Sequence, residues 1–415
     1  MKHSRINWLL ILSTPKKRRR TMKHSRINWL LLLSVMLTLS ILVAACGAPA
    51  TEPAEPVQPT ATEEATEEPA EEPTEEPAEF GRCGDRSKLS DQLNFFNWAD
   101  YIDEDILTQF EEECGVKITM DLYTSNEEAI AKIQTGTAGY DVVIPTDYAA
   151  GIMADEGMLM ELNMEYIPNA KYLDPQSLGM YYDTENKYTL PYQWSTTGLA
   201  YNVTAFPDPP DSWAVMFDLD QLCEHRGFVS MLDDSRESIA PALIYLGYSP
   251  NETDPAAHEE VIDLMLAQKE CLAGYDNENF IRTLATEEVV MAEAWGFAAA
   301  IARSENENIK YVIPKEGGDI WQDNMVIPAD APHPYTAHVF INYLLEPDIG
   351  AQLTEWTFGF TPNLAAAELL SDEYWELMES GGLLVDDETL ERLHWLKRGE
   401  GFEIFNDTWT AIKAE

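Results

Sequence analysis

Hydrophobic positions near the start of the globular part of the chain change from a strand period to a helix period. The short apolar run 93–97 predicts a strand. After it, Asp103 is placed to cap a helix that Gly115 would end. The apolar positions of this helix repeat on one face, which is typical of a helix that packs on a sheet. They are Ile106, Leu107 and Phe110.

The same alternation continues further along the chain. Residues 116–123 predict a second strand, and Ser125 with Glu128 forms the pattern of a capping box that opens a helix. The apolar run 141–145 predicts a buried strand that ends at a ligand-facing loop. Strands that alternate with helices in this way indicate an α/β fold with mainly parallel sheets.

The segment 1–45 has the pattern of an export signal. Basic residues precede the apolar run 29–45, which ends in the small residues that usually come before a lipidated cysteine. We therefore expect a signal peptide over 1–45 and a lipid on Cys46. The alternative is a transmembrane span, but the run is at the short end of the required length and no charged stop-transfer cluster follows it.

An internal repeat covers only this leader. Residues 1–10 recur as 22–31, which indicates that Met22 is the true start. The basic run 16–20 lies outside the expected mature protein, so it does not indicate a nucleic-acid patch.

Residues 46–85 are expected to form a disordered tether. Glu, Pro, Thr and Ala dominate them, and such a composition cannot bury enough apolar surface to fold. Repulsion between the Glu side chains and the stiffness of Pro keep the segment extended. A folded domain would then stand off the membrane that holds the lipid.

The acidic balance of the chain argues against nucleic-acid binding. Segment 1–45 holds nine of the 27 Lys and Arg and none of the 73 Asp and Glu. The remainder therefore has 55 more acidic than basic side chains, which would repel a phosphate backbone. Such a field raises the local concentration of a cationic solute, although an acidic surface that serves only solubility is the alternative.

The part of the chain after the tether is long enough for two domains of ordinary size, and four cysteines accompany Cys46. In an exported chain they indicate disulfides. Proximity in sequence favours Cys83 with Cys114 and Cys223 with Cys271, although three connectivities are possible. A zinc site is disfavoured because no pair has the Cys-x-x-Cys spacing.

Three short segments place a carboxylate beside a large aromatic ring. They are 97–101, 233–237 together with Trp295, and 320–323. Carboxylates replace lost hydration at the ends of an amine, and each aromatic face stabilises an ammonium group by about 0.5–2 kcal/mol. The segments therefore predict a pocket for an organic cation. Each follows an apolar run and they come from both halves of the sequence, so we expect a cleft between two lobes at the carboxyl ends of strands.

At these segments the chain resembles the spermidine/putrescine-binding proteins of bacterial ABC importers. The resemblance runs from about Leu93 to the C-terminus and rests on several motifs in order. They are Asn97-Trp98-Ala99-Asp100-Tyr101, Tyr140-Asp141-Val142-Val143-Ile144-Pro145 with Tyr148, Leu232-Asp233-Asp234-Ser235-Arg236-Glu237, Pro314-Lys315-Glu316-Gly317-Gly318 leading into Trp321-Gln322-Asp323, and Thr361-Pro362-Asn363-Leu364-Ala365-Ala366.

The resemblance implies a two-lobed α/β fold of the type II periplasmic-binding-protein class. Each lobe would be a central sheet flanked by helices, and two hinge crossovers, near 196–201 and near 316–320, would let the lobes close over a ligand. The implied division is 86–197 with 320–365 for lobe 1 and 198–319 with 366–415 for lobe 2.

The resemblance also implies a role for each matched residue. Asp234 and Glu237 would hold one primary ammonium, Asp323 a second amine and Asp100 the far end. The aromatic lining would consist of Trp98, Tyr101, Tyr148, Trp295 and Trp321. The implied protein is a periplasmic or cell-surface monomer without metal or cofactor, which performs no chemistry and delivers its polyamine to an ABC permease driven by a cytoplasmic ATPase.

Three positions depart from the family pattern. Asp100 stands where spermidine-selective members commonly have the longer Glu. Phe360 occupies the place of a ligand-contacting Tyr, and Leu396 falls at or close to an amide that helps to hold the central nitrogen. The resemblance therefore leaves the choice among putrescine, spermidine and a related diamine open.

Simpler interpretations exist for the same residues. Asp234 and Glu237 have the spacing of a helix cap, and both roles are compatible. A pair of carboxylates among aromatic rings also fits a glycoside hydrolase, although the chain has no Ser-His-Asp, His-Glu-x-x-His or phosphate-loop signature. A receptor of the same fold for another solute is a further alternative. The tryptophans assigned to the core are Trp29, Trp213, Trp356, Trp375 and Trp409.

Overall fold

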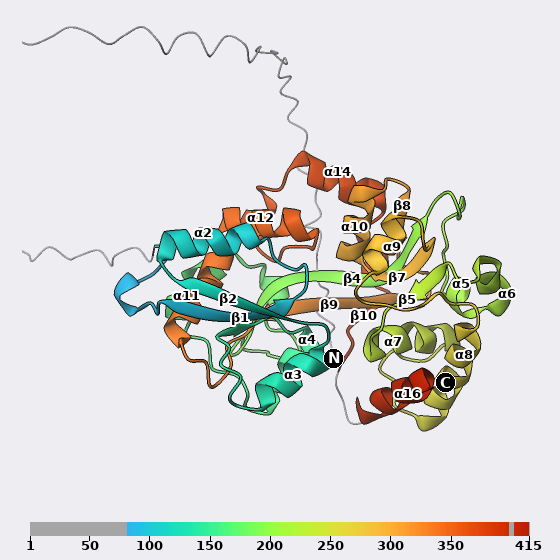
Figure 1. Cartoon of the computed structure of the whole chain (residues 1–415), viewed down its shortest axis with the longest axis horizontal. Helices are drawn as coiled ribbons and strands as arrows, with labels where there is room; N and C mark the ends of the chain where they lie inside the picture. The colour runs from blue at the N-terminus through green and yellow to red at the C-terminus, as the bar shows by residue number, and fades with distance from the viewer. Residues whose placement is uncertain (1–80, 398–401, 415) are drawn as a thin grey trace, which may run out of the picture. The chain divides into compact units, whose positions relative to one another are not determined.

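The computed structural model describes residues 81–397 and 402–414 (Figure 1). The predicted signal peptide, the start at Met22, the lipid on Cys46 and nearly all of the tether lie outside these residues. Within the described ranges, no helix combines the length and the apolar character needed to cross a membrane.

The described chain forms two sheets with helices on their faces. The strands are β1 (Gln92–Trp98), β2 (Lys117–Tyr123), β3 (Val142–Val143), β4 (Leu190–Asn202), β5 (Val229–Met231), β6 (Gly274–Tyr275), β7 (Met291–Trp295), β8 (Ile309–Val312), β9 (Gly318–Met325) and β10 (Leu393–His394).

The α-helices occur between these strands and after them. They are α2 (Glu104–Cys114), α3 (Asn126–Gln134), α4 (Asp147–Asp155), α5 (Ala214–Phe217), α6 (Leu219–Leu222), α7 (Ser235–Leu246), α8 (Pro255–Lys269), α9 (Phe280–Ala285), α10 (Gly296–Glu305), α11 (Pro334–Leu344), α12 (Pro347–Thr357), α13 (Leu364–Ala367), α14 (Asp372–Gly381), α15 (Asp387–Leu390) and α16 (Phe402–Ala414). Short 3-10 turns add η1 (Arg86–Lys88), η2 (Met164–Tyr166), η3 (Pro168–Tyr172), η4 (Pro175–Ser177) and η5 (Cys223–His225).

The small sheet has the parallel order β2-β1-β3. Successive side chains of a strand point to opposite faces. Phe95 packs with buried residues of α2 and α11, whereas Phe96 packs with those of α3 and α4. Helices therefore cover both faces of this sheet, as the apolar runs predicted.

The large sheet has the order β10-β9-β4-β7-β5-β6, and β8 also pairs with β4. The expectation of mainly parallel sheets is wrong here, because β4 runs antiparallel to β7, β8 and β9. The pairs β5–β6, β5–β7 and β9–β10 are parallel. The sheet is thus mixed, since β9 returns beside the long strand β4 in the opposite direction.

Strands β4 and β9 of the large sheet extend toward the small sheet (Figure 1). Their ladder extends from Leu190 opposite Met325 to Thr197 opposite Asp319. Beyond it, an isolated bridge joins Val326 to Val143 of the small sheet. The segments expected to act as hinges, 196–201 and 316–320, fall within β4 and at the start of β9.

Local sequence signals explain the helix ends near the site. The Asp103 carboxylate accepts from the Asp105 amide, and Gly115 ends α2 in the left-handed region at φ 76°. The Ser125 side chain accepts from the Glu128 amide at 3.2 Å. The Glu128 carboxylate reaches back to the Thr124 amide at 3.1 Å, so the predicted capping box closes one residue earlier than its standard form.

Both disulfides have the predicted pairing. Cys83 is joined to Cys114, which fastens the start of the described chain to the end of α2, and Cys223 is joined to Cys271.

The tryptophans assigned to the core differ in their burial. Trp213 is fully buried, and Trp375 and Trp409 pack against the core while partly exposed. The assignment is wrong for Trp356, which is 40% exposed. The buried residues in the last turn of α12 are Leu353, Thr354 and Thr357, whereas Trp356 lies at the surface beside the exposed Leu369. Trp29 lies outside the described residues.

Candidate functional site

A cavity of about 190 Å³ brings the acid–aromatic segments together. This volume suits an elongated small molecule rather than a single ion. The predicted residues that line it are Trp98, Asp100, Tyr101, Tyr148, Asp234, Glu237, Trp295, Trp321 and Asp323. The lining residues that the sequence did not indicate are Ala99, Tyr123, Thr124, Asn126, Thr146, Asn277, Glu278, Phe280, Ile281 and Phe297.

Strand ends position much of this lining. Trp98 is the last residue of β1, Trp295 is the last residue of β7, and Asp234 follows β5 after a short loop. These positions agree with ligand binding at the carboxyl ends of strands. The third segment differs, because Trp321 and Asp323 lie inside β9 and not at its end. The two residues are two positions apart in the strand, so their side chains point to the same face of the sheet.

Asp234 caps helix α7 and also faces the cavity. One of its carboxylate oxygens accepts from the amides of Arg236 at 2.8 Å and Glu237 at 3.1 Å. Burial raises the pKa of Asp234, and these two amides oppose the rise. The same side chain therefore caps the helix and lines the cavity.

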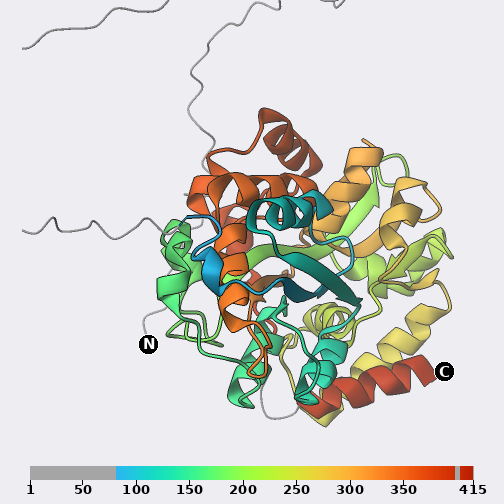
Figure 2. The ribbon, with the colours of Figure 1, turned by 60° about the vertical axis from the view of Figure 1, so that its left-hand side comes forward.

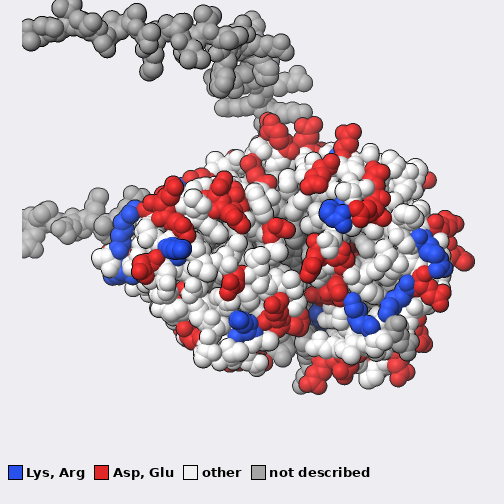
Figure 3. Space-filling view, viewed as in Figure 1, with Lys and Arg blue, Asp and Glu red and all other residues white. Residues whose placement is uncertain are grey.

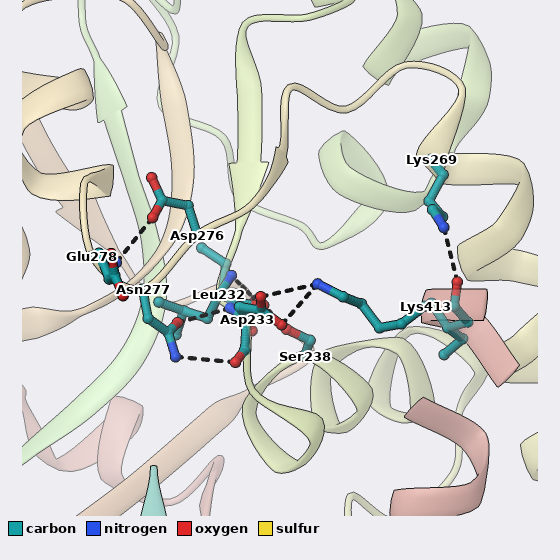
Figure 4. Close-up of polar contacts among 10 residues, drawn as sticks. Leu232, Asp233, Ser238, Lys269, Asp276, Asn277, Glu278 and Lys413 are labelled. Carbon is teal, nitrogen blue, oxygen red and sulfur yellow. Dashed lines mark hydrogen bonds and ion pairs between the residues drawn. The ribbon is translucent and has the colours of Figure 1, made fainter. Parts of the chain in front are cut away.

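The loop that carries Asp234 is fixed by polar contacts on its outer side (Figure 4). The Asp233 amide donates to Asn277 at 2.7 Å, and the Asn277 amide returns a bond to the Asp233 carbonyl at 3.1 Å. Lys413 of α16 lies 2.9 Å from both carboxylate oxygens of Asp233.

Helix α16, in red, lies beside α8, in yellow (Figure 2). The Lys269 ammonium of α8 donates to the Ile412 carbonyl of α16 at 2.9 Å.

Glu237 is held by a chain of polar contacts from the large sheet. The Thr197 hydroxyl donates to its carboxylate at 2.8 Å, and the Trp321 indole donates to Thr197 at 3.2 Å. Burial, followed by the charges of Asp319 and Asp234, raises the pKa of Glu237 well above its usual value. Without a cation, ionising this carboxyl is therefore costly.

Asp323 lies on β9, two residues after Trp321, and is almost fully buried. Burial raises its pKa to about 7, and hydrogen bonding by the Tyr101 and Thr146 hydroxyls opposes this rise only in part. Its Oδ1 atom has no well-formed hydrogen bond to any group in the described ranges. An unsatisfied buried carboxylate oxygen is a ready partner for a ligand N–H group.

Asp100 differs from the other three carboxylates because it is exposed. It adopts a left-handed backbone conformation with φ 52°, in the turn between β1 and α2. Asp tolerates this region better than most residues other than glycine.

The aromatic rings of the lining are fixed by their neighbours. The Trp98 indole donates to the Ile144 carbonyl at 2.9 Å. Phe297 links two predicted rings, since it stacks with Trp295 at 6.0 Å and meets Trp321 edge-on at 5.9 Å. The sequence did not single out Phe297, because only the turn from β7 into α10 brings it between them.

The structure places Phe360 away from the cavity lining. Its ring stacks on Trp194 at 4.5 Å, and its backbone pairs with Trp194 through two bonds of 3.0 Å. Leu396 is also buried, and its carbonyl accepts from the Tyr181 hydroxyl at 3.2 Å. At both departures from the family pattern, an apolar side chain packs inside the protein.

Three further carboxyls near the site went unnoticed in the sequence. Glu127 accepts from the Tyr148 hydroxyl at 3.3 Å, and burial together with the Asp234 charge raises its pKa to about 7. Asp147 and Asp319 are almost fully buried, and burial raises the pKa of each well above its usual value. The sequence could have indicated Asp319, because it stands two positions before Trp321 and side chains two positions apart in a strand point to the same face.

The chemistry of the arrangement favours a cation. A bound ammonium group stabilises the ionised form of a buried carboxyl whose pKa is raised. The adjacent aromatic rings can contact the ammonium group and the methylenes of the alkyl chain that carries it. In the part of the chain that the structure describes, no group of three or more His, Cys, Asp or Glu side chains has a metal-binding arrangement.

Comparisons with known proteins agree with the fold. Residues 105–379 match the model of the family described as bacterial extracellular solute-binding protein. The spermidine/putrescine-binding periplasmic protein of Salmonella typhimurium is 35% identical over 333 residues, which cover 78% of this chain and 92% of that protein. The putrescine/cadaverine-binding protein of Pseudomonas aeruginosa is 34% identical, with 78% and 94% covered.

A solved structure gives the same result. The spermidine/putrescine ABC transporter substrate-binding protein of Streptococcus pneumoniae superposes with a TM-score of 0.66 at 31% identity, over 78% of this chain and 99% of that one. The resemblance and the two-lobed type II periplasmic-binding-protein fold predicted from the sequence are thereby confirmed. The chain belongs to the bacterial extracellular solute-binding protein family.

Proposed function

We propose that this protein is an extracytoplasmic receptor that captures a polyamine and delivers it to an ABC importer. The observation that carries the proposal is the convergence of Asp100, Asp234, Glu237 and Asp323 on one cavity that aromatic rings also line. The similar proteins from Salmonella typhimurium and Pseudomonas aeruginosa, named for spermidine, putrescine and cadaverine, support the same ligand class.

The electrostatics of the cavity explain why a polyamine fits. Burial makes ionised carboxylates costly, and each ammonium group that binds compensates one of them. Asp234 and Glu237 on α7 would hold one end of the ligand, Asp323 a second amine and Asp100 the far end. Trp98, Trp295 and Trp321 would line the methylenes between these ends, whereas a neutral sugar would leave the carboxyls uncompensated.

The proposal includes the arrangement of the lobes. Lobe 1 would comprise 86–197 and 320–365, and lobe 2 would comprise 198–319 and 366–415. Bending of β4 and β9 at 196–201 and 316–320 would close the lobes over the ligand. Closure would exclude water and strengthen each ion pair.

The cellular setting belongs to the same proposal. A lipid on Cys46 would hold the protein outside the cytoplasm, and the acidic tether would let it reach a transmembrane permease with a cytoplasmic ATPase. The protein would act as a monomer, bind no nucleic acid and catalyse no reaction.

Isothermal titration tests this function. The purified protein is titrated with putrescine, spermidine and spermine, and with a neutral oligosaccharide and an amino acid as controls. Saturable binding of at least one amine and none of the controls is expected. Binding of the oligosaccharide alone, or of no amine, would overturn the proposal.

A further inference from the structure

Asp319 lies next to Glu237 without lining the cavity. Its backbone pairs with Thr197 across β9 and β4, and the Thr197 hydroxyl donates to Glu237 at 2.8 Å. Asp319 is 2% exposed, and its Oδ2 atom has no hydrogen-bond partner among the described residues. Side chains directly opposite each other in an antiparallel pair lie on the same face with Cβ atoms about 4.5–5.5 Å apart, so Asp319 and Glu237 are both neighbours of the Thr197 side chain.

A third carboxyl, Glu293 on β7, completes the cluster. Its Oε2 accepts from the Leu232 amide at 3.2 Å and lies 3.2 Å from the Ser238 hydroxyl. Its Oε1 has no partner within the described ranges, although the side chain is fully buried. Unpartnered buried carboxylate oxygens are rare in proteins, because each one costs desolvation energy.

Among the described residues, Arg236 forms no ion pair with Asp319, Glu237 or Glu293. Arg236 on α7 lies 3.8 Å from the centre of the Phe405 ring and donates to Asn251 and to the Lys397 carbonyl. Titratable groups on the elements packed around Asp319 include Asp234 at the N-cap of α7, Arg236 and Glu237 on α7, Glu293 on β7, Tyr192 and Tyr201 on β4, Asp323 on β9, Tyr311 on β8 and His394 on β10.

Two adjacent buried carboxyls cannot both ionise cheaply, so such pairs hold a proton between them. Burial and the neighbouring carboxyls raise the pKa of Asp319 and that of Glu237 well above their usual values. An ammonium group at Glu237 reverses this balance, because it stabilises the ionised form.

We propose that Asp319 is a positioning residue for ligand capture: it shares one proton with Glu237 in the empty cleft, and an ammonium group that binds Glu237 expels this proton to the solvent. Only an O–H bond breaks, and the buffer takes up the proton. The ligand-linked half of this proposal rests on the polyamine-binding function, whereas the shared proton does not.

The shared proton is tested without any ligand. Infrared spectra of the ligand-free protein at neutral pH should contain a protonated-carboxyl C=O band that weakens in Asp319→Asn and in Glu237→Gln. Asp330→Asn, a matched change at an exposed acid, should leave the band unchanged. An equal band in all four proteins would overturn the proposal, whether or not an amine binds.

Expulsion is tested by titrating putrescine in buffers of different ionisation enthalpy. The wild type should release about one proton more than Asp319→Asn, whose amide still donates to Glu237 but cannot titrate. If Asp319→Asn fails to fold, a loss of the protonated-carboxyl band in the wild type on adding putrescine replaces this comparison. Equal proton release would overturn the inference but leave the proposed function intact. Absence of any amine binding would instead reject that function and the expulsion step with it.

Discussion

Asp323 shows how burial changes the chemistry of a single carboxyl. A free aspartate titrates near pH 4 and would lose its charge, and with it an ammonium ligand, only in that range. Burial raises the pKa of Asp323 to about 7. An ammonium group binds the ionised form, so affinity should increase as the pH rises toward that value and fall as the pH drops below it.

Asp323→Asn should weaken putrescine or spermidine binding by about 2 kcal/mol, or roughly thirtyfold, because a charge-assisted hydrogen bond is lost. The variant should also show a weaker pH dependence between about pH 5.5 and 8, where Asp323 titrates. Isothermal titration across this range measures both effects. Wild-type affinity for Asp323→Asn would remove this residue from the site.

Helix α7 combines structural and ligand-facing roles at its first turn. Asp234 accepts from two amides that have no partner within the helix, and Asn is as good a cap as Asp. The charge and the cap are therefore separable by mutation.

Asp234→Asn should keep the thermal stability of the wild type and lose amine affinity. Asp234→Ala should lose affinity and also about 1 kcal/mol of stability. Thermal unfolding and isothermal titration of the two variants give the comparison. If Asp234→Asn bound amines as tightly as the wild type, the carboxyl would serve only as a cap.

The disulfide between Cys83 and Cys114 fastens the start of the described chain to the end of α2, away from the cavity lining. It closes a loop with a sequence separation of 31 residues, for which chain entropy predicts about 3–4 kcal/mol of stabilisation. The double variant Cys83→Ala/Cys114→Ala should unfold at lower urea concentration with unchanged ligand affinity in the folded state. A large loss of affinity under native conditions would instead connect this disulfide to the cleft.

The chain as a whole is acidic, with 73 Asp and Glu against 27 Lys and Arg. Acidic side chains are more widespread than basic ones on the face shown in Figure 3. Such a field attracts cationic solutes, and dissolved salt screens it over about 10 Å at 0.1 M.

Raising NaCl from about 50 mM to about 500 mM should therefore slow polyamine association several-fold and change dissociation less. Stopped-flow tryptophan fluorescence can follow both rates, because Trp98, Trp295 and Trp321 line the cavity. An association rate that does not vary with salt would reject electrostatic steering.

The sequence by itself determined the local elements and predicted the ligand class that is proposed above. Caps and apolar periods are local signals, so the strand 93–97 and the helix capped by Asp103 were predicted correctly. Carboxylates beside aromatic rings occur within single segments, so nine of the nineteen residues that line the cavity were also found.

Only the tertiary structure decided what depends on contacts between distant segments. The mixed large sheet follows from β4 and β9 running in opposite directions, and no local pattern encodes that direction. Phe360 packs on Trp194 of β4, which is more than 160 residues away in the sequence. Likewise, the pKa values of Asp323 and Asp319 depend on burial, which neighbouring residues along the chain do not specify.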